Sequence, residues 1–346
     1  MRLGTILNYA GDFKAGVEEV IEAERAGLDI VYVPEAYAFD AISRMGYLAA
    51  KTTRVEIAAG VLPIYSRTPA LIAMTAAGLD ALSDGRFTLG LGSGGPQVIE
   101  GFHGVAFDAP VQRTREIMQV CRQVWRREPL VHNGRHYQIP LPVGSGTGLG
   151  KPLKLINHPI RPNIPILLAA MGPQNTALAA EIADGWQPFP YCPEKAEKVW
   201  GASLAEGKAK RDPALGPLDI TATVPVAIGG DVTDRGDAFR HVLALYIGGM
   251  GAVGKNFYYT IACRFGYEAQ ARRIQELYLA GDKVAAAAAV PDQLLHDVGI
   301  IGPKSYVKER LAAYREAGVG TLQIIPLGYT PQERLDIISG LRELID

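Results

Sequence analysis

The sequence predicts a (β/α)8 barrel, a closed ring of eight parallel strands in which a helix follows each strand and insertions extend two of the connections. Short apolar runs rich in β-branched residues, which suit strands buried on both faces, alternate with segments of helical length. Strands that alternate with such helices pair in parallel through right-handed crossovers. Eight such units fit within 346 residues, and no break in composition divides the chain. An open doubly wound sheet is the alternative arrangement.

The expected strands are short and apolar, and several of them run out into Gly, Ser or Pro at their carboxyl ends. In chain order they are Leu3–Leu7, Leu28–Val33, Val55–Val61, Phe87–Leu91, Ile164–Ala169, Gly185–Phe189, Leu218–Ile228 and Thr321–Pro326.

The expected helices are marked by their ends. Thr68 and Pro69 suit an N-cap and a first helical position, and Gly27 and Gly85 suit residues that close a helix. Between such ends, apolar residues recur at helical spacing. The expected helices are Phe13–Ala26, Ala41–Thr52, Pro69–Leu82, Val111–Arg127, Pro173–Ala183, Pro193–Lys210, Thr233–Ile247, Pro303–Ala317 and Pro331–Leu344.

Two long segments depart from this alternation. The segment at about 128–163 is rich in Gly, Pro and His, and we expect it to leave the barrel and cover one of its mouths. The segment at about 248–290 is expected to be a second, mostly helical excursion. We therefore expect a single domain over residues 1–346 that carries two excursions.

The composition narrows the classes of function. A formal net charge of -1 provides no strong field to attract nucleic acid or an anionic membrane, and no apolar run is long enough to span a bilayer. The segment 1–8 does not have the pattern of a signal peptide. Three widely separated cysteines fit reduced thiols, so we expect a cytoplasmic protein. His132 and His136 indicate an exposed loop, and we expect no metal site.

The segment Gly90–Gly95 has the spacing of a dinucleotide-binding fingerprint and follows an expected strand. That fingerprint requires a helix to begin directly after the glycines, so that the helix N-terminus meets the pyrophosphate. We expect no helix before Pro110 and therefore reject a dinucleotide fold. The glycines still allow the backbone to approach a flat ligand closely.

Polar and turn-forming residues follow several expected strands, at the end where parallel α/β folds bind their ligands. Glu35 ends the second strand and is read as a site residue, with a salt bridge at the barrel rim as the alternative. Tyr65 and Arg67 follow the third strand, and Arg67 could equally be a solvated charge. The turn Ala169–Asn175 leads into a helix, so its free amides would bind an anion, although an ordinary strand–helix turn explains it as well.

Several segments together resemble the luciferase-like monooxygenase superfamily and, within it, the oxidoreductases that use coenzyme F420, an 8-hydroxy-5-deazaflavin. The similarity extends over essentially the whole chain in order. The segments that carry it are Ala59–Pro69, Leu82–Phe87, Gly90–Gly94, Ala170–Pro173, Ala183–Trp186, Arg310–Leu311 and Ala317–Val319.

The resemblance implies a (β/α)8 barrel with a deazaflavin lying across its carboxyl-end mouth. It implies a non-prolyl cis peptide at Gly60–Val61 behind the ring system, a ring contact from Glu35, ring-edge contacts from 93–97 and phosphate binding by 170–173. The residues expected to bind the coenzyme are Asn8, Glu35, Gly60, Val61, Gly92, Ser93, Gly94, Gln97, Ala170, Met171, Gly172 and Pro173.

One departure from the resemblance concerns the chemistry. Sugar-phosphate dehydrogenases of this group carry a histidine base where this chain has Ala36, so oxidation of a sugar is not expected. We expect hydride transfer between the deazaflavin and a small organic substrate, with Glu35, Tyr37 or water handling the proton. The alternatives are an FMN-dependent monooxygenase and a non-catalytic flavin-binding protein. The resemblance also implies a homo-oligomer.

Overall fold

The computed structural model describes residues 1–232 and 234–345 and contains a closed parallel barrel. Thr233, the expected start of a helix, and Asp346 lie outside the described residues. Of the ten strands in the main sheet, two (β4 and β11) lie beside the ring and eight form it, because the last strand pairs with the first. The ring is β1 (Arg2–Ile6), β2 (Ile30–Val33), β3 (Glu56–Ala59), β5 (Phe87–Gly92), β8 (Ile166–Ala169), β9 (Gly185–Gln187), β10 (Asp219–Ile228) and β12 (Val319–Pro326).

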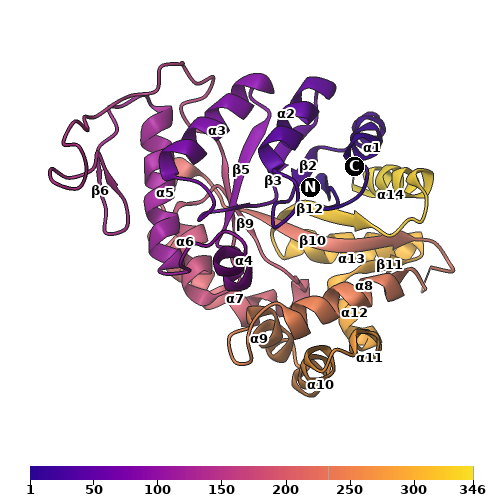
Figure 1. Cartoon of the computed structure of the whole chain (residues 1–346). Helices are drawn as coiled ribbons and strands as arrows, with labels where there is room; N and C mark the ends of the chain where they lie inside the picture. The colour runs from indigo at the N-terminus through magenta and orange to yellow at the C-terminus, as the bar shows by residue number, and fades with distance from the viewer. Residues whose placement is uncertain (233, 346) are drawn as a thin grey trace.

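Each expected strand overlaps one strand of this ring, so the predicted barrel is confirmed and the open sheet is wrong. Helices surround the strands (Figure 1) and begin and end within a few residues of the expected positions. They are α1 (Phe13–Arg25), α2 (Ala41–Lys51), α3 (Pro69–Leu82), α5 (Pro110–Trp125), α6 (Pro173–Ile182), α7 (Pro193–Lys208), α8 (Arg235–Ala244), α13 (Lys304–Glu316) and α14 (Pro331–Ile345).

Outside the two excursions, the sequence did not predict four short elements. These are β4 (Leu62–Pro63), α4 (Pro96–Gly101), the 3-10 turn Pro213–Leu215 and β11 (Ile300–Gly302).

Helix α4 corrects one expectation, because it begins directly after Gly90–Gly95. Pro96 occupies its first position, where a missing N–H costs no hydrogen bond. The rejection of a dinucleotide fold still holds, because β5 belongs to the closed ring.

The first excursion contains a small antiparallel hairpin, β6 (His132–Asn133) and β7 (Gln138–Ile139), and projects beside α5 at the left of Figure 1. The carboxylate of Glu116 on α5 accepts hydrogen bonds from three hairpin amides. The expectation that this excursion covers a mouth is therefore wrong, since it packs on an outer helix. His132 is also not exposed: its Nε2 lies 3.3 Å from Glu116.

The second excursion is mostly helical, as predicted. It follows a π-helical turn at Leu245–Gly249, which continues directly from α8. Its helices are α9 (Phe257–Arg264), α10 (Glu268–Leu279), α11 (Lys283–Ala288) and α12 (Asp292–Val298).

Side chains of the barrel strands alternate between two buried regions. Val31 and Val33 of β2 face the main core beneath the helices, whereas Ile30 and Tyr32 belong to a separate cluster with partners on β3 and β8. Period-two alternation places this second cluster inside the ring. Strands β3 and β5 also approach closely, because a Cβ at Gly90 would lie 1.8 Å from the carbonyl oxygen of Ala59.

The described residues contain neither a membrane-spanning helix nor a cluster of metal-binding side chains. No helix among them has both the length and the apolar character that crossing a membrane requires. No group of three His, Cys, Asp or Glu side chains among them is placed to hold a metal ion.

Candidate active site

The turns singled out in the sequence lie at one end of the barrel, because all eight ring strands are parallel. Hydrogen bonds link neighbouring turns around this rim. Leu7 N–H donates to the Tyr32 carbonyl at 2.9 Å, and Gly60 N–H donates to the Val33 carbonyl at 2.8 Å. Further round, Ala170 N–H donates to the Gln187 carbonyl at 3.3 Å. The rim therefore brings together the ends of β1, β2, β3, β5, β8 and β9.

The third strand ends in the cis peptide Gly60–Val61 that the resemblance implies. Neighbouring side chains leave no room for a Cβ at two glycines of this rim. A Cβ at Gly60 would lie 2.8 Å from Cβ of Tyr32, and a Cβ at Gly92 would lie 2.7 Å from Cγ2 of Val61. Glycine at these positions lets the Tyr32 and Val61 side chains lie close to the backbone, which gives a closely packed rim.

Glu35 forms a two-pronged ion pair with Arg67. Their nitrogen and oxygen atoms are 2.6 and 2.8 Å apart, and the side chains are only 7% and 12% exposed, respectively. Glu35 also accepts the N–H of Ala41 at 2.9 Å, and Arg67 donates to Asp40 at 2.8 Å. The hydrogen bonds to Glu35 raise the pKa of Arg67, whereas burial lowers it. The rim salt bridge considered for Glu35 is present, and Arg67 is not a solvated charge.

The two tyrosines near this pair differ in exposure. Tyr37 is 70% exposed, and its ring centroid lies 6.3 Å from that of Phe102. Tyr65 is buried, and its hydroxyl donates to the Asp108 carbonyl at 2.7 Å. Burial raises the pKa of Tyr65 to about 12. Tyr37 is therefore free to meet a ligand, while Tyr65 has a structural partner.

The turn after β5 is open to solvent. Ser93 donates its hydroxyl to the Gly94 carbonyl at 3.3 Å, and Gly94 has a φ of 69°, which favours glycine. Gln97, on the first turn of α4, is exposed. These residues present backbone and amide groups beside Val61 without a fixed charge.

The turn after β8 leads into α6 with an uncapped N-terminus. Gly172 is the N-cap residue and provides no side-chain hydrogen bond, and Pro173 follows it. The first turn also holds Asn175, whose buried side-chain oxygen has no partner among the described residues. Helix N-termini with free amides attract anions.

Two features of the rim were missed by the sequence analysis. Arg44 of α2 is buried and donates to the Asn8 carbonyl at 2.8 Å, which fixes the end of β1. Phe189, Tyr246 and Tyr258 form an aromatic cluster beyond β9. A predicted N-cap at Asn256 would have signalled the helix that carries part of this cluster. Trp186 of β9 is fully buried in the core.

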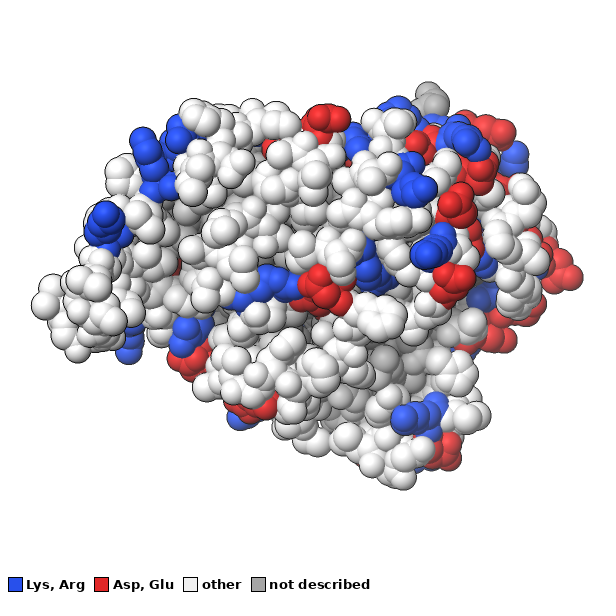
Figure 2. All heavy atoms as spheres, turned by 45° about the horizontal axis from the view of Figure 1, so that its top comes forward, with Lys and Arg blue, Asp and Glu red and all other residues white. Residues whose placement is uncertain are grey.

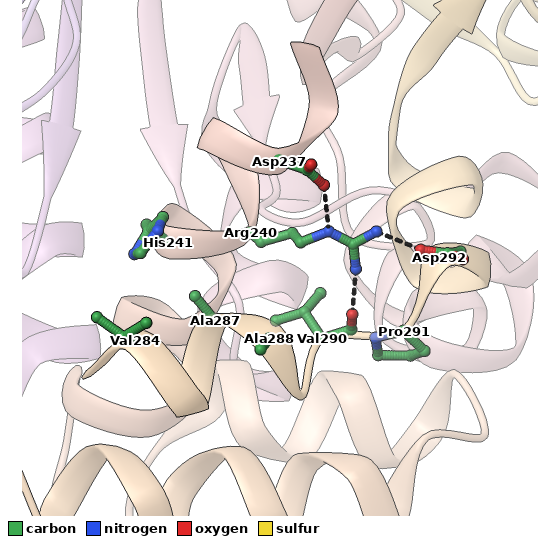
Figure 3. Close-up of a pocket in the computed structure, with 9 residues that line it drawn as sticks. All are labelled: Asp237, Arg240, His241, Val284, Ala287, Ala288, Val290, Pro291 and Asp292. Atoms are coloured by element: carbon green, nitrogen blue, oxygen red, sulfur yellow. Dashed lines mark hydrogen bonds and ion pairs between the residues drawn. The ribbon is translucent and has the colours of Figure 1, made fainter. Parts of the chain in front are cut away.

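Two surface cavities are present, one away from this rim and one that reaches it at Pro173. One, of about 670 Å³, lies between α8, α11 and the start of α12, where Arg240 donates to Asp237, Asp292 and the Val290 carbonyl (Figure 3). Each of the three nitrogens of that guanidinium donates to the protein, so this arginine has a structural role there. The other, of about 250 Å³, lies between α5, α6 and α7.

The comparison with known families decides the class of this protein. The family model described as luciferase-like monooxygenase matches residues 1–321. The chain belongs to the luciferase-like monooxygenase family. This family membership agrees with the closed barrel, and the expectation of an oxidoreductase enzyme of the luciferase-like family is confirmed.

Several relatives of this luciferase-like protein are named as enzymes that use coenzyme F420 or reduce a methanopterin. It is 41% identical over 339 residues to a Mycobacterium tuberculosis protein named "Putative coenzyme F420-dependent oxidoreductase Rv3520c", with 96% of this chain and 97% of the relative covered. It is 26% identical over 330 residues to the 5,10-methylenetetrahydromethanopterin reductase of Archaeoglobus fulgidus, covering 92% and 91%. Among solved structures, the coenzyme F420-dependent tetrahydromethanopterin reductase of Methanopyrus kandleri superposes with a TM-score of 0.82 at 21% identity, covering 98% and 97%, which supports the fold.

Proposed function

We propose that this luciferase-like protein binds coenzyme F420 at the carboxyl-end rim and transfers a hydride between it and a small organic substrate. The observation that carries the proposal is the 41% identity, over nearly the full length of both chains, to a relative named for this coenzyme. The gathering of glycine-bearing turns at a single rim supports it, since a planar tricycle needs backbone that it can approach closely.

Different parts of the rim would hold different parts of the coenzyme. The uncapped start of α6, from Ala170 to Pro173, would take the phosphate, because the Met171 and Gly172 amides form no backbone hydrogen bond with described residues and no acidic side chain lies in the first turn of α6. The remaining turns would hold the ring system. Its proposed contacts are Asn8, Glu35, Gly60, Val61, Gly92, Ser93, Gly94 and Gln97.

The bound deazaflavin would supply the hydride chemistry, and the chain would supply orientation and control of the proton. Glu35 and Arg67 hold each other in one geometry, so their contact with a ring would be fixed before the coenzyme binds. Tyr37 is the proposed source of the proton, because its hydroxyl has no hydrogen bond within the described structure and it lies two residues beyond Glu35. Ala36 provides no base, which favours reduction of the substrate.

A titration with both coenzymes tests this proposal. Purified apo protein is titrated with coenzyme F420 and with FMN, each followed by the fluorescence of the added coenzyme. We expect saturable binding of the deazaflavin in the micromolar range or tighter and much weaker binding of FMN. Tight binding of FMN without affinity for the deazaflavin would favour the alternative, a flavin monooxygenase. Deazaflavin binding without turnover of any activated alkene, imine or ketone would favour a binding protein.

We also propose that the chain forms a homodimer through the outer side of α3. Leu71, Met74 and Leu82 are exposed there, and Gly78 between them has open space around it. The only charged residue of α3, Asp80, is buried. Figure 2 shows that large areas on this side of the molecule carry no charged side chain. A helix that is apolar on every side is normally covered, and an uncharged surface can pair with its own copy across a two-fold axis.

Light scattering tests the dimer. The wild type is expected at twice the chain mass of 37.1 kDa, and Met74→Lys at the chain mass. A monomeric wild type would contradict the proposal.

The three free cysteines remain consistent with the proposed cytoplasmic location.

A further inference from the structure

Three half-buried aromatic rings form one cluster at the carboxyl end of β9. Phe189 follows that strand, Tyr246 lies in the π-helical turn, and Tyr258 lies in the first turn of α9. The ring centroids of Phe189 and Tyr246 are 4.6 Å apart, and those of Tyr246 and Tyr258 are 4.7 Å apart. The third distance, from Phe189 to Tyr258, is 6.2 Å. These spacings and tilted angles are typical of aromatic side chains that pack directly against one another.

One buried side chain fixes the two tyrosines. The Nδ2 atom of Asn256 donates to the carbonyl oxygens of Tyr246 and Ile247, at 2.9 and 3.0 Å. Its Oδ1 atom accepts the backbone N–H of Tyr258 and Tyr259, at 2.9 and 3.1 Å. Asn256 is only 3% exposed, so this amide joins the π-helical turn to α9 in a protected place. The aromatic cluster is therefore set before any ligand arrives.

The phenol groups of this cluster are left open. The hydroxyls of Tyr246 and Tyr258 form no hydrogen bond with any described residue, and the same is true of Tyr9 at the end of β1. Burial raises the pKa of Tyr258, as do the neighbouring phenols of Tyr246 and Tyr9. Burial also raises the pKa of Tyr246. These hydroxyls therefore keep their protons at neutral pH and can donate hydrogen bonds.

The surroundings of the rings are uncharged. No Lys or Arg within the described ranges stacks on Phe189, Tyr246 or Tyr258. The only neighbouring groups that shift the pKa of Tyr258 are the phenols of Tyr246 and Tyr9, and burial alone shifts the pKa of Tyr246. A charged ligand would lose its hydration here without gaining a counter-ion. A neutral ring would lose little and would gain stacking area and a hydrogen bond.

We propose that Phe189, Tyr246 and Tyr258 form the wall that binds the substrate, and that this wall selects an uncharged, planar, ring-bearing carbonyl compound. The substrate ring packs on the three aromatic rings, and its carbonyl oxygen accepts a hydrogen bond from the Tyr246 or Tyr258 hydroxyl. This inference rests on the proposed function where it concerns hydride transfer to the substrate. The binding of a ring-bearing carbonyl compound to the wall does not depend on the proposed function.

Three small probes test the selection without the coenzyme. Acetophenone has a planar ring and one carbonyl, cyclohexyl methyl ketone has the same carbonyl on a puckered ring, and benzoate is planar but charged. Ligand-observed NMR titration of the full chain should give the tightest binding for acetophenone. We expect at least threefold weaker binding for the puckered ketone and no saturable binding for benzoate. Equal binding of all three, or preference for benzoate, would overturn the proposal.

Matched variants assign the binding to these residues. Tyr246→Phe and Tyr258→Phe keep the rings and remove the hydroxyls. The double variant should bind acetophenone about 2- to 10-fold more weakly, the range expected for one neutral hydrogen bond. Tyr259→Phe is the control, because Tyr259 lies next to Tyr258 on the same helix and outside the aromatic cluster. If the double variant binds acetophenone as tightly as the wild type, the proposed hydrogen bond is wrong. Phe189→Leu removes one ring of the wall. If this variant still prefers acetophenone to the puckered ketone as strongly as the wild type does, the proposed wall is wrong.

The same variants separate this inference from the proposed function. With reduced coenzyme F420 and cyclohex-2-en-1-one, the double variant should show a higher KM and an unchanged coenzyme Kd. If the protein binds FMN instead of coenzyme F420 but still prefers acetophenone among the three probes, the proposed wall stands and the proposed coenzyme is wrong. If it turns over coenzyme F420 but shows no preference for acetophenone, the proposed wall is wrong.

Discussion

The two ends of the barrel use their polar groups in opposite ways. At the amino ends of the strands, polar side chains satisfy backbone groups. Arg86, just before β5, donates to four carbonyl oxygens and to the Thr52 hydroxyl. Glu24 accepts the N–H groups of three successive residues, Thr53, Arg54 and Val55, which lead into β3. This end is closed to ligands because its hydrogen bonds are already made.

At the carboxyl ends, several polar groups are left open. Helix α6 starts without a side-chain cap, and the hydroxyls of Tyr9, Tyr246 and Tyr258 have no partner in the described structure. The ion pair of Glu35 with Arg67 holds two rim turns in place. In barrels of this kind the carboxyl end carries activity and the amino end carries stability. The difference predicts that substitutions at the two ends will affect different measurements.

Arg86→Met should have the largest effect on stability. It leaves four carbonyl oxygens without their donor, and we expect the free energy of unfolding to fall by about 3–5 kcal/mol. Urea denaturation measures the change. Arg126→Met is the control, because Arg126 is an exposed arginine paired with Glu128 and its loss should cost about 1 kcal/mol or less. If both variants lose a similar free energy of unfolding, the amino end of the barrel does not have the special role in stability that we assign to it.

Gly172→Leu should have the largest effect on the coenzyme. Its φ of -77° suits any residue, and the added Cβ meets only the Phe257 ring, 2.8 Å away, which is exposed and can turn aside. We expect the stability to change by about 1 kcal/mol or less. The side chain would cover the free amides of α6, so the coenzyme Kd should rise by about 10-fold or more.

Fluorescence titration measures that Kd. Gly230→Leu is the control, because Gly230 has open space around it at the end of β10. An unchanged Kd in Gly172→Leu would remove this turn from the site.

Glu24→Gln should have a smaller effect that depends on pH. Burial tends to raise the pKa of Glu24, but its backbone hydrogen bonds lower it overall below the usual 4.5. The stability that it contributes is therefore full above about pH 4.5 and is lost as the pH falls through the lowered value. We expect a deficit of about 1–3 kcal/mol in the variant at pH 7 that shrinks below pH 4.5. A deficit that does not change with pH would show that the charge of Glu24 is unimportant.

The sequence was enough to predict the barrel because each strand is a compact apolar run with its own turn signals. It was also enough to place the turn at Gly172, where Gly and Pro leave a local mark, whereas the cis peptide at Gly60–Val61 was expected only from the family resemblance. Short or long-range features were not visible. Helix α4 has only six residues, too few for a period to show. The cluster around Tyr246 depends on Asn256, which joins segments ten residues apart, and on packing against Phe189, far away in the chain.

Hydrogen exchange with and without coenzyme F420 tests most directly the claim that separated turns form one site. Mass spectrometry of peptic fragments would compare the apo and coenzyme-bound protein. We expect slower exchange on binding in the segments around 60–61, 92–97 and 170–174 together, and no change around 52–56 and 84–86 at the opposite end. Protection of only one of the three rim segments, or protection at the amino ends of the strands, would contradict the account.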